Sequence, residues 1–153
     1  MNIWFETKQI KGEKMGTHAF IAKKTNENNY RTIYCHWDGY PEWVGRILVE
    51  DYNTPDKVDR LINLGDISAL YSKLDPDPKL PHSFDNPQPG VTIAYGRDRK
   101  EKGVDARVMP FADLADRNNC VSYVYIYTED KGWQYFKPWS DDPSLKDVRT
   151  ALV

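Results

Sequence analysis

The sequence predicts an α+β fold, in which an antiparallel sheet of about five strands carries two main helices on one face. The clearest evidence for the sheet is at residues 121–136, where VSYVYIYT alternates tyrosines with aliphatic residues before the turn EDKG and the strand WQYF. The evidence for the helices is at residues 41–64, where apolar residues recur at helical spacing. These two stretches favour a small sheet that is covered by a pair of helices.

The N-terminal part of the chain is predicted to supply further strands. Residues 2–7 contain Ile-Trp-Phe and are predicted to form a short strand. Residues 17–24 and 31–37 are rich in β-branched and aromatic residues, and a polar turn separates them. We therefore expect these last two segments to pair as an antiparallel hairpin.

Two helices are predicted directly after this hairpin. Pro41 suits the first position of a helix, because its missing N–H would have no partner there, and this helix should end near Tyr52. Thr54 is a good N-cap for a second helix, with Pro55 at the first helical position. Gly65 follows as the residue that ends it.

The remainder of the chain is more irregular. Residues 74–90 contain five prolines, which predicts an extended surface loop that is either functional or mobile. Residues 91–95 return to strand character, and the charged run GRDRKEKG at 96–103 is expected to form a hairpin or a loop. We expect a single domain with its core at about 15–137, followed by a C-terminal tail at 138–153.

Composition excludes several classes of protein. The 153 residues carry a net charge of −2, which argues against a general duplex-DNA-binding protein. The chain has no apolar run long enough to span a bilayer and no signal peptide, so we expect a cytoplasmic protein without membrane association. Its two cysteines, Cys35 and Cys120, both fall in predicted strands and are expected to be reduced core residues.

A candidate ligand site lies at the corner between the second predicted strand and the first helix. His36, Asp38 and Tyr40 surround an Asp-Gly turn and should lie beside free backbone N–H groups at the helix start. His36 could act as a base that Asp38 orients, which is the catalytic alternative. The competing interpretation is a hydrogen-bonded structural corner.

Three further residues are candidates for ligand binding. Arg97 and Arg99 are forked donors that suit a phosphate or a carboxylate, although a charged loop is most often simply solvated. His82 lies in the proline-rich segment, where it can complete a site or take part only in a local turn. Whether these residues meet His36 in space depends on the fold.

Metal and cofactor chemistry finds no support in the motifs. There are only three histidines, and no HxxxH or CxxC spacing supplies the further ligands that zinc needs, so we expect no metal. There is also no P-loop, no dinucleotide fingerprint and no GxSxG elbow, so we expect no cofactor. Cys35 and His36 are neighbours on a strand and point to opposite faces, so they should not form a nucleophile–base pair.

Several motifs together resemble a known family. IYCHWDGYP at 33–41, the helical stretch at 44–70, HSFDNP at 82–87 and GRDR at 96–99 are similar to a family of small, uncharacterised proteins encoded by bacteriophages and prophages. The resemblance covers roughly residues 15 to 100 and includes the opening strand pair. It implies an accessory role in the host cytoplasm, such as interference with host defence.

Two classes of function follow from these observations. The favoured one is a non-enzymatic binding protein that counteracts a host defence system, either by sequestering a small anionic, nucleotide-like signal or by binding a defence protein. The alternative is a small hydrolase that acts on a nucleotide or an amide, with His36 as general base. Exposed sheet edges and aromatic faces also favour self-association, so a homo-oligomer is a further candidate for the state of this protein.

Overall fold

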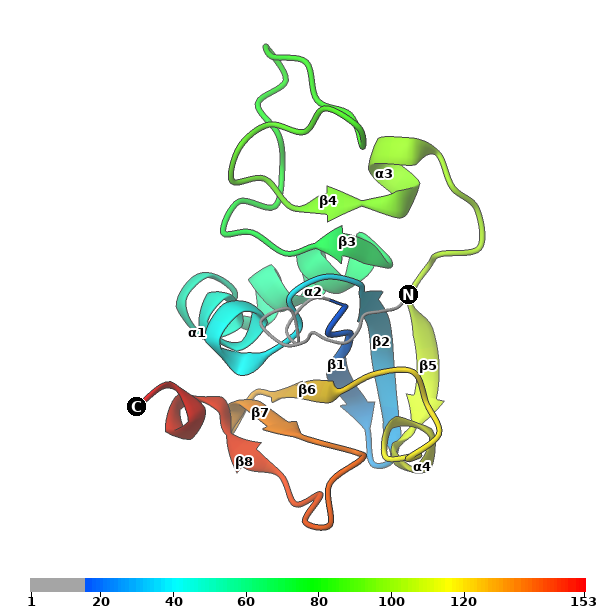
Figure 1. Ribbon diagram of the computed structural model, residues 1–153, viewed down its shortest axis with the longest axis vertical. Coiled ribbons are helices and arrows are strands. Elements are labelled where there is room, and N and C mark those ends of the chain that lie inside the picture. Colours follow the sequence, from blue (N-terminus) through cyan, green and yellow to red (C-terminus); the bar gives the residue numbers. More distant parts are fainter. Residues whose placement is uncertain (1–15) are drawn as a thin grey trace.

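A mixed sheet of eight strands forms the centre of the fold, in the order β4-β3-β2-β1-β6-β7-β8, with β5 paired to β2 (Figure 1). The computed structural model describes residues 16–153, and the strand predicted at residues 2–7 lies outside them. The strands are β1 (Ala19–Asn26), β2 (Asn29–Cys35), β3 (Ile67–Ala69), β4 (Ile93–Ala94), β5 (Arg107–Pro110), β6 (Tyr123–Thr128), β7 (Gly132–Phe136) and β8 (Lys146–Asp147). The helices are the π-helical turn η2 (Pro41–Gly45), α1 (Arg46–Asp51), α2 (Pro55–Asn63), α3 (Tyr95–Arg99), α4 (Phe111–Leu114) and the 3₁₀ helix η3 (Val148–Leu152).

The α+β class is confirmed, but the sheet is not purely antiparallel. β1 and β2 form the predicted antiparallel hairpin. β1 also pairs in parallel with β6, and β2 pairs in parallel with β3. The prediction of an antiparallel sheet of about five strands is therefore wrong in both respects, because strand partners are chosen by tertiary packing across long stretches of chain.

The strands that the sequence missed are short. β3, β5 and β8 contain three, four and two residues, which is too few for an alternating pattern to be recognised. β8 and η3 lie in the segment that was expected to be a tail outside the core. Val148 of η3 is fully buried there, so the packed core extends into the C-terminal residues.

The two main helices begin and end close to where the sequence predicts. η2 and α1 form one helical segment from Pro41 to Asp51, with Pro41 at its start. The hydroxyl of Thr54 accepts a hydrogen bond from the N–H of Lys57, as expected for the N-cap of α2. Gly65 then has a positive φ of 84° and lies so close to the Val104 carbonyl oxygen that a Cβ would be 2.6 Å from it.

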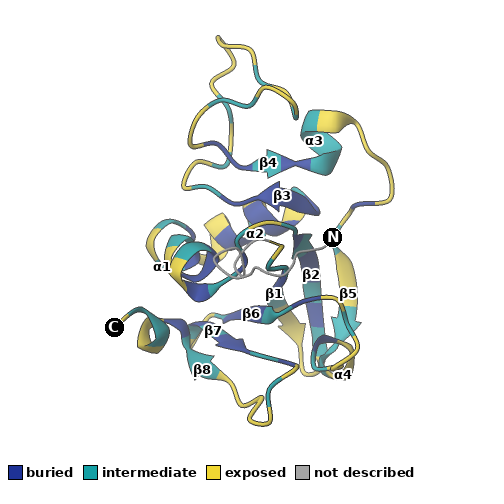
Figure 2. Cartoon of the chain, viewed as in Figure 1, coloured by how far each residue is buried: buried dark blue, intermediate teal, exposed yellow. Residues whose placement is uncertain are grey.

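The sheet buries a different apolar cluster on each face. The larger cluster joins α1 and α2 to residues of β1, β2, β6 and β7, and it includes Tyr125 and Tyr127. The smaller cluster lies on the other face under α4 and includes Val124 and Ile126. The predicted division of β6 into an aromatic and an aliphatic face is thus confirmed, and buried residues concentrate on the central strands (Figure 2).

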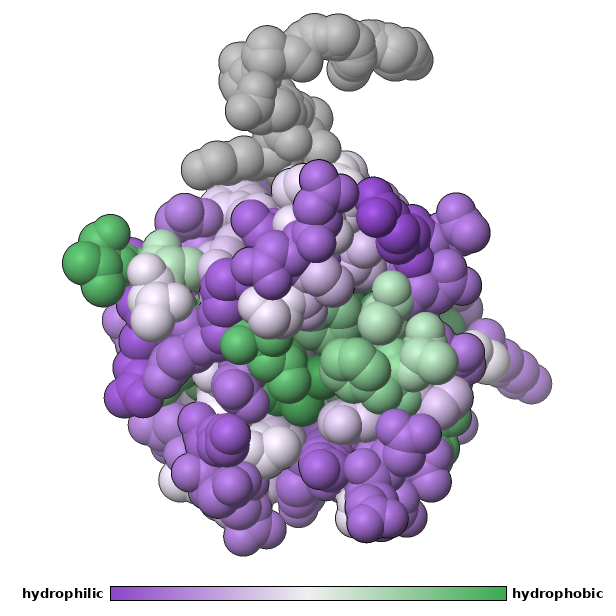
Figure 3. Space-filling view, turned by 90° about the horizontal axis from the view of Figure 1, so that it is seen from below, coloured by the Kyte–Doolittle hydropathy of each residue, from purple (hydrophilic) through white to green (hydrophobic). Residues whose placement is uncertain are grey.

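Much of the surface outside this core is polar. Seen from below, the molecule shows an apolar area in the middle of a mostly hydrophilic surface (Figure 3). The charged segment 96–103 was expected to be a hairpin or a loop, but its first residues belong to the one-turn helix α3 (Tyr95–Arg99). None of the described helices combines the length and the apolar character needed to cross a bilayer.

Candidate functional site

One half of the sheet presents a polar and aromatic surface on the face opposite α1 and α2. The register aligns Ala19 with Cys35, Cys35 with Ile67, and Ile67 with Ala94, and all four of these side chains are buried toward the helices. Because side chains alternate along a strand, the flanking residues point the other way. This surface, called the β1–β4 face below, consists of His18, Tyr34, His36, Asp66, Ser68 and Tyr95.

A stacked pair of histidines lies at the centre of the β1–β4 face. The Nδ1 of His18 donates to the carbonyl oxygen of His36 at 2.6 Å, and the two rings stack with centroids 4.5 Å apart. The hydroxyl of Tyr34 lies 2.9 Å from Nδ1 of His36, within hydrogen-bonding distance. Because the carbonyl uses Nδ1 of His18, the Nε2 of a neutral His18 ring carries the lone pair.

Burial sets the protonation states in this cluster. It lowers the pKa of His36 below the usual 6.5, and the charge of a protonated His18 lowers it further. Burial also raises the pKa of the Tyr34 phenol well above its usual value, with smaller contributions from Cys120 and Tyr95. At neutral pH, His36 and Tyr34 are therefore uncharged hydrogen-bonding groups.

Trp37 extends this cluster toward solvent. Its ring packs edge-on against His36 with centroids 4.7 Å apart, and 40% of the residue remains exposed. An exposed tryptophan beside stacked imidazoles offers planar surfaces to a ring-containing ligand. The predicted ligand residue His36 thus lies in an aromatic environment.

The corner after β2 has a different geometry from the one expected. Asp38, rather than Gly39, adopts the positive φ, at 56°. Gly39 is needed because a Cβ there would lie 2.8 Å from the Cβ of Ala19 and 3.0 Å from the Thr17 carbonyl oxygen. The hydroxyl of Tyr125 donates to the Gly39 carbonyl at 2.7 Å and fixes the corner from the core side.

The structure does not pair Asp38 with His36. Within residues 16–153, no hydrogen bond or ion pair joins the two side chains, and the hydrogen-bonding partner of the His36 ring is Tyr34. Burial raises the pKa of the Asp38 carboxyl. Tyr40, the third residue of the predicted corner, is half-buried and is the N-cap residue of η2.

His82 and Arg97 meet, but in a buried cluster that anchors the proline-rich loop. Their common partner is Asp98, which lies 2.8 Å from Nε of Arg97 and 3.2 Å from Nε2 of His82. The side chains of His82 and Asp98 are only 5% and 3% exposed. Arg97 also donates to the carbonyl oxygens of Leu74 and Thr92 at 2.7 and 2.6 Å, so its guanidinium is committed to holding the loop.

The electrostatics of Asp98 fit this anchoring role. Burial alone would raise the pKa of its carboxyl, but hydrogen bonds from Arg97 and the Ala94 N–H, together with the close His82 ring, lower the pKa below its usual value. On the other side of the His82 ring, Nδ1 accepts from the N–H of Gln88 at 3.0 Å. The loop is thus tied to α3 through charge-assisted contacts.

Arg99 borders the β1–β4 face. Its guanidinium carbon lies 4.3 Å from the ring centroid of Phe84 and 5.0 Å from that of Tyr95, and the two rings stack on each other. Arg99 also donates to Glu101 through Nε and Nη2, and within residues 16–153 its Nη1 has no hydrogen-bond partner. Of the predicted basic residues, Arg99 is the one positioned to meet a ligand on this face.

Sequence reasoning missed several residues of the face. His18, Tyr34 and Tyr95 were not chosen as candidates, and neither was the Asp66–Arg107 ion pair. An oxygen of the Asp66 carboxylate accepts from the Tyr34 N–H at 2.8 Å. Because side chains alternate along a strand, a buried Cys35 indicates that Tyr34 points to the opposite face. The other residues lie on this face only because of how the strands pair, which the sequence does not show.

Metal binding and thiol chemistry find no support in the geometry. Among the described residues, no group of three or more His, Cys, Asp or Glu side chains is arranged to hold a metal ion. Cys35 is buried, and burial raises the pKa of its thiol to about 12. Cys120 is exposed and lies outside the strands, so the expectation that it belongs to the core is wrong.

The fold and this surface define an α+β protein with a partly buried, aromatic and hydrogen-bonding sheet face. The chain matches no family model, no curated protein and no solved structure.

Proposed function

We propose that the protein is a non-enzymatic binding protein that captures a small anionic, nucleotide-like ligand on the β1–β4 face. The observation that supports this most directly is the stacked pair of His18 and His36, with Tyr34 hydrogen-bonded to His36 and Trp37 exposed beside it. Stacking of a base on aromatic side chains contributes about 1–3 kcal/mol per base. The uncharged His36 ring and the Tyr34 hydroxyl supply hydrogen bonds to the base or the sugar.

Arginines at the border of the face suit the anionic part of such a ligand. Arg99 lies over Tyr95, and no hydrogen bond from its Nη1 is formed in the part of the chain that the structure describes; Arg107 is held in place by the carboxylate of Asp66. A positioned guanidinium recognises phosphate with forked, charge-assisted hydrogen bonds. We assign base recognition to the histidines and Trp37, and phosphate recognition to the arginines.

The proposed biological setting is that of a bacteriophage accessory protein in the host cytoplasm. It rests on the resemblance of the IYCHWDGYP motif and its neighbouring segments to a phage and prophage family. Sequestering a nucleotide-like signal would counteract a host defence system that depends on it. Binding of a defence protein by the same exposed aromatic face is the corresponding protein-partner alternative.

The test is a thermal-shift screen of the purified protein against mono-, di- and cyclic nucleotides, followed by native mass spectrometry. A ligand at a hundredfold over its Kd stabilises the folded state by about 2.7 kcal/mol, which is a readily measured shift. We expect bound ligand of unchanged mass, with the shift reduced in His18→Ala and Trp37→Ala and retained in the exposed-loop control Leu80→Ala. If no nucleotide shifts the midpoint, nucleotide capture is wrong and the protein-partner alternative takes its place.

A hydrolase that acts on a nucleotide or amide is the second candidate, favoured by one observation. The hydrogen bond with Tyr34 orients the His36 ring, which is the arrangement that a general base requires. Tyr34 would then take the orienting role that the sequence suggested for Asp38. His36→Ala should abolish turnover in an enzyme but only weaken capture by a binding protein.

A further inference from the structure

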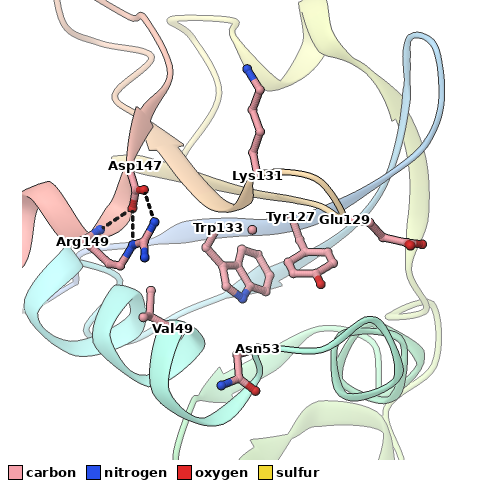
Figure 4. Close-up of a pocket in the computed structure, with 9 residues that line it drawn as sticks. Val49, Asn53, Tyr127, Glu129, Lys131, Trp133, Asp147 and Arg149 are labelled. Carbon is pink, nitrogen blue, oxygen red and sulfur yellow. Dashed lines mark hydrogen bonds and ion pairs between the residues drawn. The ribbon is translucent and has the colours of Figure 1, made fainter.

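A second concave site lies away from the β1–β4 face and shares no residue with it. A pocket of about 340 Å³ opens between the C-terminal end of α1, the β6–β7 hairpin and the point where β8 meets η3 (Figure 4). Its aromatic floor is formed by Trp133 and Tyr127, and Val49 and Asn53 line it from the helix side. This size is at the lower end of the range of small-molecule sites.

The floor of the pocket is a rigid aromatic pair. Tyr127 and Trp133 are direct partners across the β6–β7 hairpin, and their ring centroids are 5.3 Å apart. The indole N–H of Trp133 donates to the carbonyl oxygen of Tyr52 at 2.8 Å, which fixes that ring. Both residues are only 4% exposed, so the floor is formed before any ligand arrives.

The hydroxyl of Tyr127 is the feature that points to a ligand. Tyr127 lines the pocket and is 96% buried as a residue, and among the described residues its hydroxyl has no hydrogen-bond partner. The hydroxyl oxygen is not one of the buried side-chain atoms that lack a partner, so it is accessible and can exchange a hydrogen bond with a ligand. The side-chain amide of Asn53 also has no partner within residues 16–153, and Figure 4 shows it below the Tyr127 and Trp133 rings.

The charges around the pocket indicate a neutral ligand. Arg149 donates to both carboxylate oxygens of Asp147, at 3.0 and 2.6 Å, so these two charges neutralise each other. Glu129 and Lys131 carry opposite charges, and Figure 4 shows both side chains pointing away from the aromatic floor. The rim therefore has no net charge to attract a phosphate.

We propose that this pocket binds a neutral, planar heterocycle of the nucleobase type, as a site separate from the anionic-ligand site. The ring lies against Trp133 and Tyr127, and its edge exchanges hydrogen bonds with the Asn53 amide and the Tyr127 hydroxyl. An amide that both donates and accepts matches the adjacent donor and acceptor on the edge of adenine. The pocket proposal stands whether or not the β1–β4 face binds nucleotides.

The experiment is an isothermal titration of the full-length chain with adenosine, which has the base but no phosphate. Tyr127→Phe keeps the ring and removes only the hydroxyl, and Asn53→Ala removes the amide. We expect saturable binding that each variant weakens about five- to tenfold, which corresponds to one hydrogen bond. Leu80→Ala, in the distant proline-rich loop, should bind adenosine as the parent chain does.

Three outcomes would overturn the proposal. They are no binding of adenosine to the parent chain, unchanged binding in Tyr127→Phe and Asn53→Ala, and loss of binding in His36→Ala while the pocket variants still bind. The last result would assign adenosine to the β1–β4 face. A thermal midpoint measured for each variant separates loss of the site from loss of the fold.

Discussion

His18 immediately precedes β1 and His36 immediately follows β2, and their imidazole rings stack with centroids 4.5 Å apart. The Nδ1 of His18 donates to the backbone carbonyl of His36 at 2.6 Å, so the first ring is fixed against the backbone of the second residue. This contact lies at the end of the β1–β2 hairpin opposite the turn, and it places both rings on one surface. It is the centre of the proposed ligand site.

His18→Ala is predicted to weaken both ligand capture and stability. The change removes the ring stack and one hydrogen bond, which together should lower the free energy of unfolding by about 1–2 kcal/mol. Urea unfolding measures the stability, and the nucleotide thermal shift measures capture. A His18→Ala variant with unchanged ligand shift would remove His18 from the site.

Stability is predicted to depend on the protonation of His36. Because the pKa of His36 is lower in the folded chain than the usual 6.5, the unfolded chain takes up this proton first as the pH falls. The contribution of His36 is therefore complete above pH 6.5 and is lost progressively as the pH falls from there toward the lower folded pKa. Denaturant unfolding at a series of pH values should show this slope, and His36→Gln should reduce it.

Gly39→Ala is predicted to destabilise the corner after β2. A Cβ at this position would lie 2.8 Å from the Cβ of Ala19 and 3.0 Å from a backbone oxygen, and neither atom can move without shifting β1. We expect a loss of about 1–3 kcal/mol in denaturant unfolding. Gly96→Ala is the matched control, because its nearest neighbour is the end of a valine side chain at 3.3 Å, and it should cost less.

Asp98→Asn is predicted to release the proline-rich loop. The carboxylate holds both His82 and Arg97 while it is almost fully buried, so removing its charge should cost about 2–4 kcal/mol. Limited proteolysis with trypsin at Lys79 should accelerate in this variant. The exposed change Asp85→Asn in the same loop should leave the cleavage rate unchanged, and equal rates for both variants would contradict the anchoring role.

Acidification should release the same loop in the parent chain. The pKa of Asp98 is lower in the folded chain than its usual 3.8, so its contribution is present above that value and is lost as the pH falls through the folded pKa. An acid-stable protease such as pepsin, applied at a series of pH values below 4, should cut residues 74–90 increasingly fast. Asp98→Asn should lack this pH dependence, because an amide does not titrate.

Local features of the fold could be predicted from the sequence because their causes are local. The helix at Pro41, the Thr54 cap of α2 and the alternation of β6 each depend on residues within one or two turns or along one strand. His36 and Arg99 could be chosen for the same reason, since each side chain was judged by its own chemistry and its neighbours. These inferences did not require knowledge of the tertiary contacts between elements.

Tertiary structure alone decided how these parts combine. The parallel pairings of β1 with β6 and of β2 with β3 join segments that are far apart in the chain. The pairing of β2 with β3, and of β3 with β4, places Asp66 and Tyr95 on the same face as His36. The same packing turned Arg97 inward to Asp98. Strand pairing and burial depend on the free energy of the whole fold, and no single segment of sequence contains that information.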